Sequence, residues 1–188
     1  MLASRDGIEN QEMMVEAAMR LMLLRHAKSK RPAGVEDHDR PLSRRGRQAS
    51  EQMGKYMAET GLVPDQAVVS TARRTQETWQ LARPAFEHEI ACHWEGRLYD
   101  ASPATILEII RQTGEDIKSQ ALVGHNPGLQ DLALSLIGKG DPDALARLRR
   151  KLPTAGLVVI DFKAGSWGEL AERTGDLERF VAPSTIAP

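Results

Sequence analysis

Residues 21–29 read LMLLRHAKS, and this stretch decides the fold. Its first four residues form a short continuous apolar run, which is typical of a β-strand buried on both faces of a sheet. Two cationic side chains, Arg25 and His26, follow the run directly. We therefore expect a buried strand over residues 21–24 that ends at a pair of chemically active side chains.

Outward from this stretch, strand-like and helix-like segments alternate along the chain. Further strands are expected over residues 67–70, within 86–94, over 121–123 and over 157–160, with an edge strand around 167–172. Helices are expected over residues 43–60, 72–82, 103–114, 127–137 and 144–151. This alternation predicts a single-domain α/β fold, a three-layer sandwich whose mostly parallel central sheet is flanked by helices.

The length of 188 residues suits one domain with a sizeable core and makes a second full domain unnecessary. We assign residues 1–18 to an N-terminal leader, because they lack a strong apolar face, and residues 19–188 to the domain. The leader is expected to be a short helix or a disordered segment. Met19 directly precedes the first strand, so an alternative is that translation begins there and the leader is a start-site artefact.

The composition argues against several classes of protein. A net charge of -1 and an aromatic content of 4% give no global attraction to nucleic acid or membranes and few rings for stacking on bases. A single cysteine, Cys92, excludes an internal disulfide and a multi-cysteine zinc site. No apolar run approaches the roughly 20 residues of a membrane-spanning helix, and the acidic N-terminal region does not resemble a secretory signal. We expect a cytoplasmic protein.

Three of the expected strands end in polar residues that are suited to binding an anion. The first strand ends at Arg25 and His26, the second is followed by Arg74, and the strand over 121–123 is followed by His125. Ligands of open α/β sheets bind outside the carboxyl ends of the strands, so these side chains are expected to meet at one edge. Such a cluster of cations favours an anion in its centre, and guanidinium groups match the oxygens of phosphate. The helix start at Asn126 adds backbone N–H groups that also favour an anion.

A histidine between arginines has a lowered pKa, because neighbouring positive charges disfavour the imidazolium form. A neutral histidine can attack phosphorus and form a covalent intermediate that water later hydrolyses. The arginines and the second histidine would stabilise the charge of the transition state. No metal ion and no cofactor are expected, because these donors already supply positive charge.

The sequence around these residues resembles the histidine phosphatase superfamily, and within it the short bacterial phosphohistidine phosphatases. The first strand of the superfamily ends in Arg-His-Gly, and residues 25–27 here read RHA, a variant associated with the short branch. The second arginine of the family lies in Ser-Pro-x-x-Arg-Ala-x-x-Thr, which residues 70–78 match with Arg74 at the arginine position. The second histidine lies in residues 123–128, which read VGHNPG. Further matches lie at residues 39–46, 98–103 and 152–155, so the resemblance covers roughly residues 19–181.

The resemblance implies a role for each matched residue. His26 is the expected phosphorylated nucleophile, and Arg25, Arg74 and His125 are expected to hold the phosphoryl group. Ser29 matches a position that often lies near the substrate, and we count Ser29 and Asn126 among the expected phosphate-binding residues.

The general acid is not marked by a clear motif. Many relatives use a glutamate after the third strand, but the short branch does not show it clearly. Glu95, Asp100 and Asp39 are the candidates in this chain, and we choose Asp39.

We expect a metal-independent phosphatase that removes phosphate from phosphohistidine in signalling proteins. The alternative is a phosphatase or mutase for a small phosphorylated metabolite, although the 99 positions from His26 to His125 leave little material for the lid of a mutase. A non-catalytic phosphate-binding module is a third reading, and the presence of both histidines argues against it. His88, Cys92 and His93 are not assigned to a metal site, because strand geometry directs His93 to the opposite face.

Overall fold

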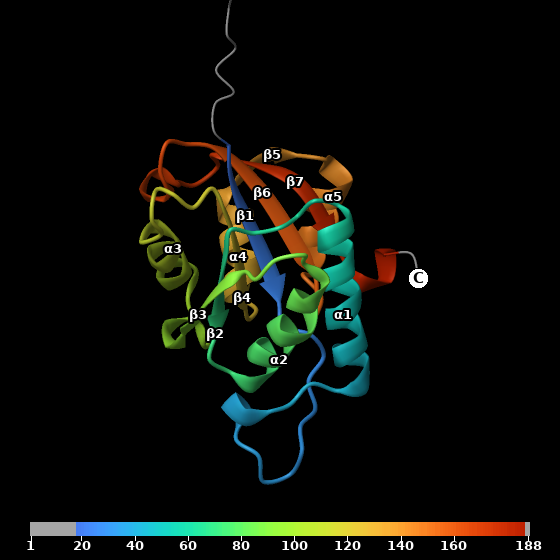
Figure 1. The fold of residues 1–188 in the computed structure, drawn as a ribbon. Coiled ribbons are helices and arrows are strands. Elements are labelled where there is room, and N and C mark those ends of the chain that lie inside the picture. Colours follow the sequence, from blue (N-terminus) through green and yellow to red (C-terminus); the bar gives the residue numbers. More distant parts are fainter. Residues whose placement is uncertain (1–17, 187–188) are drawn as a thin grey trace, which may run out of the picture.

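The first strand, β1, lies in the middle of a seven-stranded sheet in the order β3-β2-β4-β1-β6-β7-β5 (Figure 1). The computed structural model describes residues 18–186. The strands are β1 (Ala18–Arg25), β2 (Gln66–Ser70), β3 (Ala91–Glu95), β4 (Ser119–Gly124), β5 (Ile137–Gly140), β6 (Leu157–Lys163) and β7 (Gly175–Val181). The leader expected over residues 1–18 lies outside the described residues, except for Ala18, with which β1 begins.

The strand directions determine where the functional side chains can meet. β1 pairs in parallel with β4, β4 with β2, and β2 with β3. β6 pairs antiparallel with both β1 and β7, and β5 pairs in parallel with β7, so β6 alone among the described strands is reversed. The mostly parallel sheet is therefore confirmed, and the carboxyl ends of β1, β2 and β4 lie along one edge.

Within residues 18–186, five α-helices cover the two faces of this sheet. They are α1 (Arg44–Glu59), α2 (Arg73–Ala82), α3 (Pro103–Arg111), α4 (Gly128–Leu136) and α5 (Pro142–Arg150). Figure 1 shows α1 and α2 in front of the sheet and α4 behind it. The buried residues of α1 and α2 join one core cluster, and those of α3, α4 and α5 join the other. The predicted three-layer sandwich is confirmed.

The two core clusters follow from the alternation of side chains along β1. Leu21 and Leu23 pack into the cluster with α3, α4 and α5, whereas Met22 and Leu24 pack into the cluster with α1 and α2. All four side chains have no exposed surface. Burying each side chain of this kind stabilises the fold by roughly 1.5–3 kcal/mol, so β1 anchors both layers at once.

The N-terminus of α1 is capped by Ser43, but the charges of its first turns oppose the helix dipole. The Ser43 side-chain oxygen accepts a hydrogen bond from the backbone N–H of Gly46 (3.1 Å). The first turns carry Arg44, Arg45 and Arg47, with no acidic residue in the first turn and no basic residue in the last. An acidic side chain at a helix N-terminus stabilises the helix by about 0.3–1 kcal/mol, and a cation at the same place is unfavourable. The local sequence therefore does not favour the stability of α1 at this end.

Glycine on α1 permits the close packing of the front layer. A Cβ atom added to Gly54 would overlap the backbone of Ala82 at the end of α2. A Cβ atom added to Gly46 would likewise overlap the backbone carbonyl of Lys28. Both approaches bring α1 against segments that carry site residues, one at α2 and one just after β1.

Two parts of the C-terminal half differ from the sequence-based expectation. The edge strand expected around residues 167–172 is wrong, because residues 167–169 form a 3-10 turn in which the buried Trp167 donates to the carbonyl oxygen of Ile117 (2.7 Å). The strand instead lies further along, at β7, and the short strand β5 was not anticipated. Within residues 18–186, no helix combines the length and the apolar character that a membrane crossing needs.

Candidate active site

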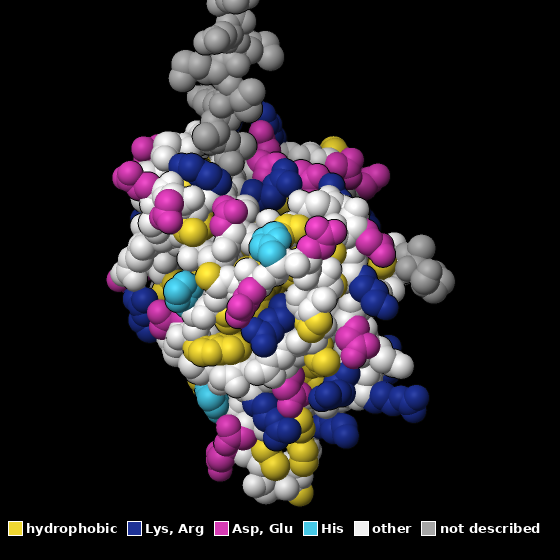
Figure 2. Space-filling model, viewed as in Figure 1, with side chains coloured by type: hydrophobic (Ala, Val, Ile, Leu, Met, Phe, Trp, Pro, Cys, Tyr) yellow, Lys and Arg dark blue, Asp and Glu magenta, His cyan; other side chains and the backbone are white. Residues whose placement is uncertain are grey.

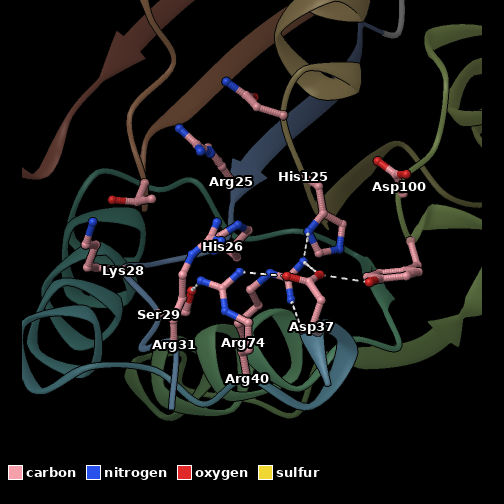
Figure 3. A pocket seen from close by; sticks show the side chains of 13 residues that line it. Arg25, His26, Lys28, Ser29, Arg31, Asp37, Arg40, Arg74, Asp100 and His125 are labelled. Atoms are coloured by element: carbon pink, nitrogen blue, oxygen red, sulfur yellow. Dashed lines mark hydrogen bonds and ion pairs between the residues drawn. The ribbon is translucent and has the colours of Figure 1, made fainter. Parts of the chain in front are cut away.

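A pocket of about 620 Å³ lies at the edge of the sheet where β1, β2 and β4 end (Figure 3). Its lining consists almost entirely of polar and charged side chains. The residues that line it are Arg25, His26, Lys28, Ser29, Arg31, Asp37, Arg40, Arg74, Tyr99, Asp100, His125, Asn126 and Thr154. The predicted convergence of Arg25, His26, Arg74 and His125 on one spot is therefore observed.

His26 is held in one tautomer by the backbone next to it. Its Nδ1 atom lies 2.8 Å from the carbonyl oxygen of Ala27. A carbonyl oxygen can only accept, so Nδ1 carries the proton and Nε2 keeps its lone pair. Burial is the main cause that lowers the pKa of His26 to about 4; the Ala27 hydrogen bond opposes this shift, and the charges of Arg74 and Arg25 add to it. At neutral pH, His26 therefore has an unprotonated Nε2 atom.

His125 follows β4 and faces His26, with 5.3 Å between the ring centroids. Its Nε2 atom lies 2.8 Å from the Ser70 hydroxyl at the end of β2, and a guanidinium nitrogen of Arg74 donates to Nδ1 at 3.4 Å. Because Arg74 can only donate, Nε2 carries the proton and donates to Ser70. Burial, followed by the neighbouring His26 and Arg74, lowers the pKa of His125 to about 3, so this ring is also neutral.

Arg74, the buried arginine at the start of α2, is bound to the half-exposed carboxylate of Asp37. It donates to the Asp37 carboxylate (3.1 Å) and to the Asp37 backbone oxygen (2.6 Å). The same carboxylate accepts from Arg40 (2.8 Å) and from the Tyr99 hydroxyl (2.8 Å). The hydrogen bonds from Arg40 and Tyr99 hold the pKa of Asp37 well below its usual range, so Asp37 is ionised. The same bond raises the pKa of Tyr99.

Arg25, at the end of β1, is held by the segment that precedes β6. It donates to the carbonyl oxygen of Leu152 (2.8 Å), and burial lowers its pKa. The Nε atoms of Arg25 and Arg74 are both buried and have no hydrogen-bond partner among the described residues. A buried donor without an acceptor is costly, so both guanidinium groups are held at some expense of stability in this part of the fold.

Ser29 and Asn126, the other predicted phosphate-binding residues, both line the pocket but differ in their hydrogen bonds. Ser29 lines the pocket, where its hydroxyl accepts from Arg40 (2.6 Å). Asn126 also lines it, but its amide nitrogen donates to Gln130 (3.0 Å) and Leu152 (3.2 Å) rather than into the pocket. The structure therefore does not direct the donors of Asn126 towards a bound phosphate.

The choice of Asp39 as general acid is not supported by its position. Asp39 does not line the pocket; its side chain is 70% exposed and lies 3.4 Å from His38. Of the other two candidates, Asp100 lines the pocket, whereas Glu95 lies outside it and binds Arg97. The reason for the error is that residues 37–39 form a 3-10 turn, which directs Asp37 inward and Asp39 to solvent.

Asp37 is the main pocket residue that the sequence did not indicate. Its contacts come from Arg40, Arg74 and Tyr99, which lie on three separate segments. The segment 98–103, which resembles the family pattern and contains Tyr99, was the available signal that this side of the pocket is functional. Arg31 was also missed, and no local motif marks it.

The arrangement as a whole is suited to holding a tetrahedral oxyanion beside a neutral imidazole. Guanidinium groups of Arg25 and Arg74 supply fixed positive charge, and the two histidines supply a lone pair and a polar ring. Within residues 18–186, no group of three or more His, Cys, Asp or Glu side chains is arranged to hold a metal ion. This geometry defines a phosphoryl-transfer site.

The chain belongs to the histidine phosphatase superfamily. The family model of the histidine phosphatase superfamily (branch 1) matches residues 21–102, which include Arg25, His26 and Arg74. A solved structure from Agrobacterium tumefaciens, described as a candidate phosphohistidine phosphatase SixA, is 32% identical with a TM-score of 0.75, and the match covers 88% of this chain and 98% of that chain. An uncharacterised protein of Mycobacterium tuberculosis is 33% identical over 162 residues, which are 85% of this chain and 99% of that protein. Membership of the superfamily implies phosphatase activity.

More distant solved structures share the fold. The protein histidine phosphatase SixA complexed with tungstate is 16% identical with a TM-score of 0.71, over 90% of this chain and all of that chain. A candidate α-ribazole-5'-phosphate phosphatase from Escherichia coli is 15% identical with a TM-score of 0.60, over 88% of this chain and 97% of that chain. These likenesses support the fold alone, because the same fold serves different substrates.

Proposed function

We propose that this phosphatase removes the phosphoryl group from phosphohistidine on protein substrates, through a covalent intermediate on His26. The observation that carries this proposal is the state of His26: a buried imidazole with Nδ1 bonded to the Ala27 carbonyl oxygen and with an unprotonated Nε2 in the pocket. A nucleophile needs an available lone pair at neutral pH, and His26 provides one without a separate base.

The reaction proceeds in two displacements. In the first, Nε2 of His26 attacks phosphorus and the N–P bond to the substrate imidazole breaks; that imidazole keeps the electron pair and leaves neutral, because its other ring nitrogen has taken a proton from solvent. In the second, water attacks the phosphoryl group on His26, the Nε2–P bond breaks, and inorganic phosphate is released. The proton on Nδ1 stays on the ring throughout, bonded to Ala27, and this makes His26 a good leaving group in the second step. Arg25 and Arg74 stabilise the negative charge of both transition states.

The leaving group is the reason to favour phosphohistidine over a phosphate ester. An alkoxide needs a proton donor as it leaves, whereas an imidazole leaves neutral once its ring is protonated, with an unperturbed pKa of about 6.5. Asp37 is ionised by its hydrogen bonds and cannot act as that donor, and Asp39 lies outside the pocket. A substrate that needs little acid catalysis therefore suits this site.

The named relatives support the phosphohistidine proposal more strongly than the alternative, a small phosphorylated metabolite. The candidate SixA from Agrobacterium tumefaciens shares 32% identity with nearly full coverage, whereas the candidate α-ribazole-5'-phosphate phosphatase shares 15%. A small phosphorylated metabolite is the second candidate, because a pocket of about 620 Å³ exceeds the space that one phosphoryl group needs. Asp100, which also lines the pocket, would then be the candidate acid, because Asp37 is ionised.

A labelling experiment tests the proposal. A ³²P-phosphorylated histidine-phosphotransfer domain is mixed with wild type, with His26→Ala and with His88→Ala, whose exposed histidine lies outside the pocket. Wild type and His88→Ala should show an acid-labile, base-stable label on His26 when quenched during turnover, and His26→Ala should show neither label nor turnover. A label on another residue, or a kcat/KM ten times higher for sugar phosphates or phosphoglycerates, would overturn it.

A further inference from the structure

The surface next to the pocket carries an uneven distribution of charge. Residues 28–47 contain seven Lys or Arg against three Asp or Glu, a formal charge of +4 in a chain whose total is -1. Figure 2 shows dark-blue side chains gathered at the lower right of the molecule, beside the first turns of α1. We call the exposed members of this set the cationic rim: Lys28, Lys30, Arg31, Arg44, Arg45 and Arg47.

The cationic rim is continuous with the pocket. Lys28 and Arg31 line the pocket itself. The start of α1 is bonded directly to this segment, because the Ser43 backbone N–H donates to the carbonyl oxygen of Lys28 (2.8 Å). The Lys30 N–H likewise donates to the carbonyl oxygen of Pro41 (2.8 Å). The rim therefore leads outward from the catalytic histidines onto the first turn of α1.

The charges of the rim have little internal compensation. Among the described residues, the rim forms a single ion pair, between Arg47 and Glu77 at 3.9 Å. Three of its members also sit at the N-terminus of α1, where the helix dipole disfavours cations and no acidic residue offsets them. A merely solvated face would gain stability from acidic side chains at this position. The placement is consistent with a role in binding an anion from outside the chain.

We infer that the cationic rim docks an acidic protein surface that surrounds the phosphohistidine of the substrate. This inference rests on the proposed function and names the character of the partner. The rim residues on α1 do not line the pocket, so they do not contact a phosphoryl group bound there. That group would instead be held by Arg25 and Arg74, which line the pocket. Complementary charge accelerates the encounter and orients the two proteins, and salt weakens it.

The test compares two pairs of exposed cations. The rim variant is Arg44→Glu with Arg45→Glu, which leaves the pocket lining unchanged. The matched control is Lys118→Glu with Lys163→Glu, which has the same change in charge at the opposite end of the sheet. The substrates are a phosphorylated histidine-phosphotransfer domain with acidic residues around its phosphohistidine, and free phosphohistidine.

The rim variant should raise KM for the phosphorylated domain by about tenfold at low salt, and the effect should shrink in 0.5 M NaCl. Its kcat/KM for free phosphohistidine should stay within about twofold of wild type, and the control should behave as wild type with both substrates. Neutralising the acidic residues of the domain should remove the difference. The rim variant should also melt a few degrees higher, because glutamate suits a helix N-terminus, and this excludes misfolding as the cause.

Different experimental results would contradict the docking inference and the proposed function. A wild-type enzyme that leaves the phosphorylated domain intact contradicts the proposed function. Docking is judged separately, from the dissociation constant of the domain measured with and without the two rim substitutions in a His26→Ala background. An unchanged dissociation constant, or an equal loss in the Lys118 and Lys163 control, overturns the docking inference.

Discussion

Lowering the pH to 5 should leave most of the activity in place, although an ordinary histidine nucleophile would lose nearly all of it. The reason is the environment of His26. Burial, together with charge repulsion from Arg74, Arg25 and Arg40, lowers its pKa to about 4. Protonation of Nε2 would remove the lone pair that attacks phosphorus, so activity in the free enzyme should follow the neutral fraction of this ring.

The expected difference is large enough to measure. With a pKa of about 4, His26 is about 90% neutral at pH 5, whereas an unperturbed histidine with a pKa of 6.5 is about 3% neutral there. The ratio of kcat/KM at pH 5 to that at pH 7 should therefore be near one rather than near 0.04, after correction for the ionisation of the substrate.

NMR titration of the histidine rings gives the direct measurement. The resonances of His26 and His125 are assigned from the His26→Ala and His125→Ala variants, and neither should shift between pH 8 and about 5, because their pKa values are lowered to about 4 and about 3. A titration of His26 with a midpoint near 6.5, in protein that circular dichroism shows to be folded, would refute the reasoning.

The same pKa shifts determine how stability depends on pH. Both histidines have a lower pKa in the folded state than the unfolded value of about 6.5, so between about pH 6.5 and 4 the unfolded chain binds more protons. The stabilising contribution is fully present above pH 6.5 and is lost as the pH falls through this window. Urea unfolding at pH 7 and pH 5 should show the loss, and His125→Gln should reduce it.

Three further predictions concern activity without a metal ion, the Asp37 carboxylate and the packing of α1 against α2. Activity should survive exhaustive chelation, because guanidinium groups supply the positive charge, and restoration by magnesium or zinc of activity lost in EDTA would contradict this. Asp37→Asn should strengthen inhibition by inorganic phosphate about fivefold, because a neutral amide competes less well for Arg74 than a carboxylate does; an unchanged inhibition constant would count against that competition. Gly54→Ala should lower the free energy of unfolding by roughly 2 kcal/mol despite the better helix propensity of alanine, because its Cβ overlaps Ala82, and a more stable variant in urea would show that α1 and α2 can separate freely.

The sequence was sufficient to predict the central strands and the residues at their ends. The run at 21–24 is fully apolar because β1 has helices on both faces, so the pattern and the fold have one cause. The parallel pairing of β1 with β4 then places Arg25 opposite Gly124, and His26 and His125 follow side by side. This convergence depends only on strand direction, which the alternation of strands and helices indicates.

The parts that were missed depend on contacts rather than on local pattern. The strand β5 has four residues, two of them glycine, and β7 mixes charged and apolar residues at the far side of the sheet. Neither gives a periodic signal that separates it from a loop. Asp37 and Asp39 are equivalent in the sequence, and only the 3-10 turn decides which carboxylate faces Arg74.

The central position of β1 has a consequence for how the protein is made. β1 is the first described strand to leave the ribosome, yet its two neighbours are β4, which begins at residue 119, and β6, which begins at residue 157. A nascent chain that ends before β4 therefore has a first strand with no partner at either edge, although α1 and α2 can already cover one of its apolar faces. An unpaired apolar strand is prone to pairing with other chains, so we expect growing copies of this protein on one messenger to benefit most from chaperones or from wide spacing of ribosomes before β6 has emerged.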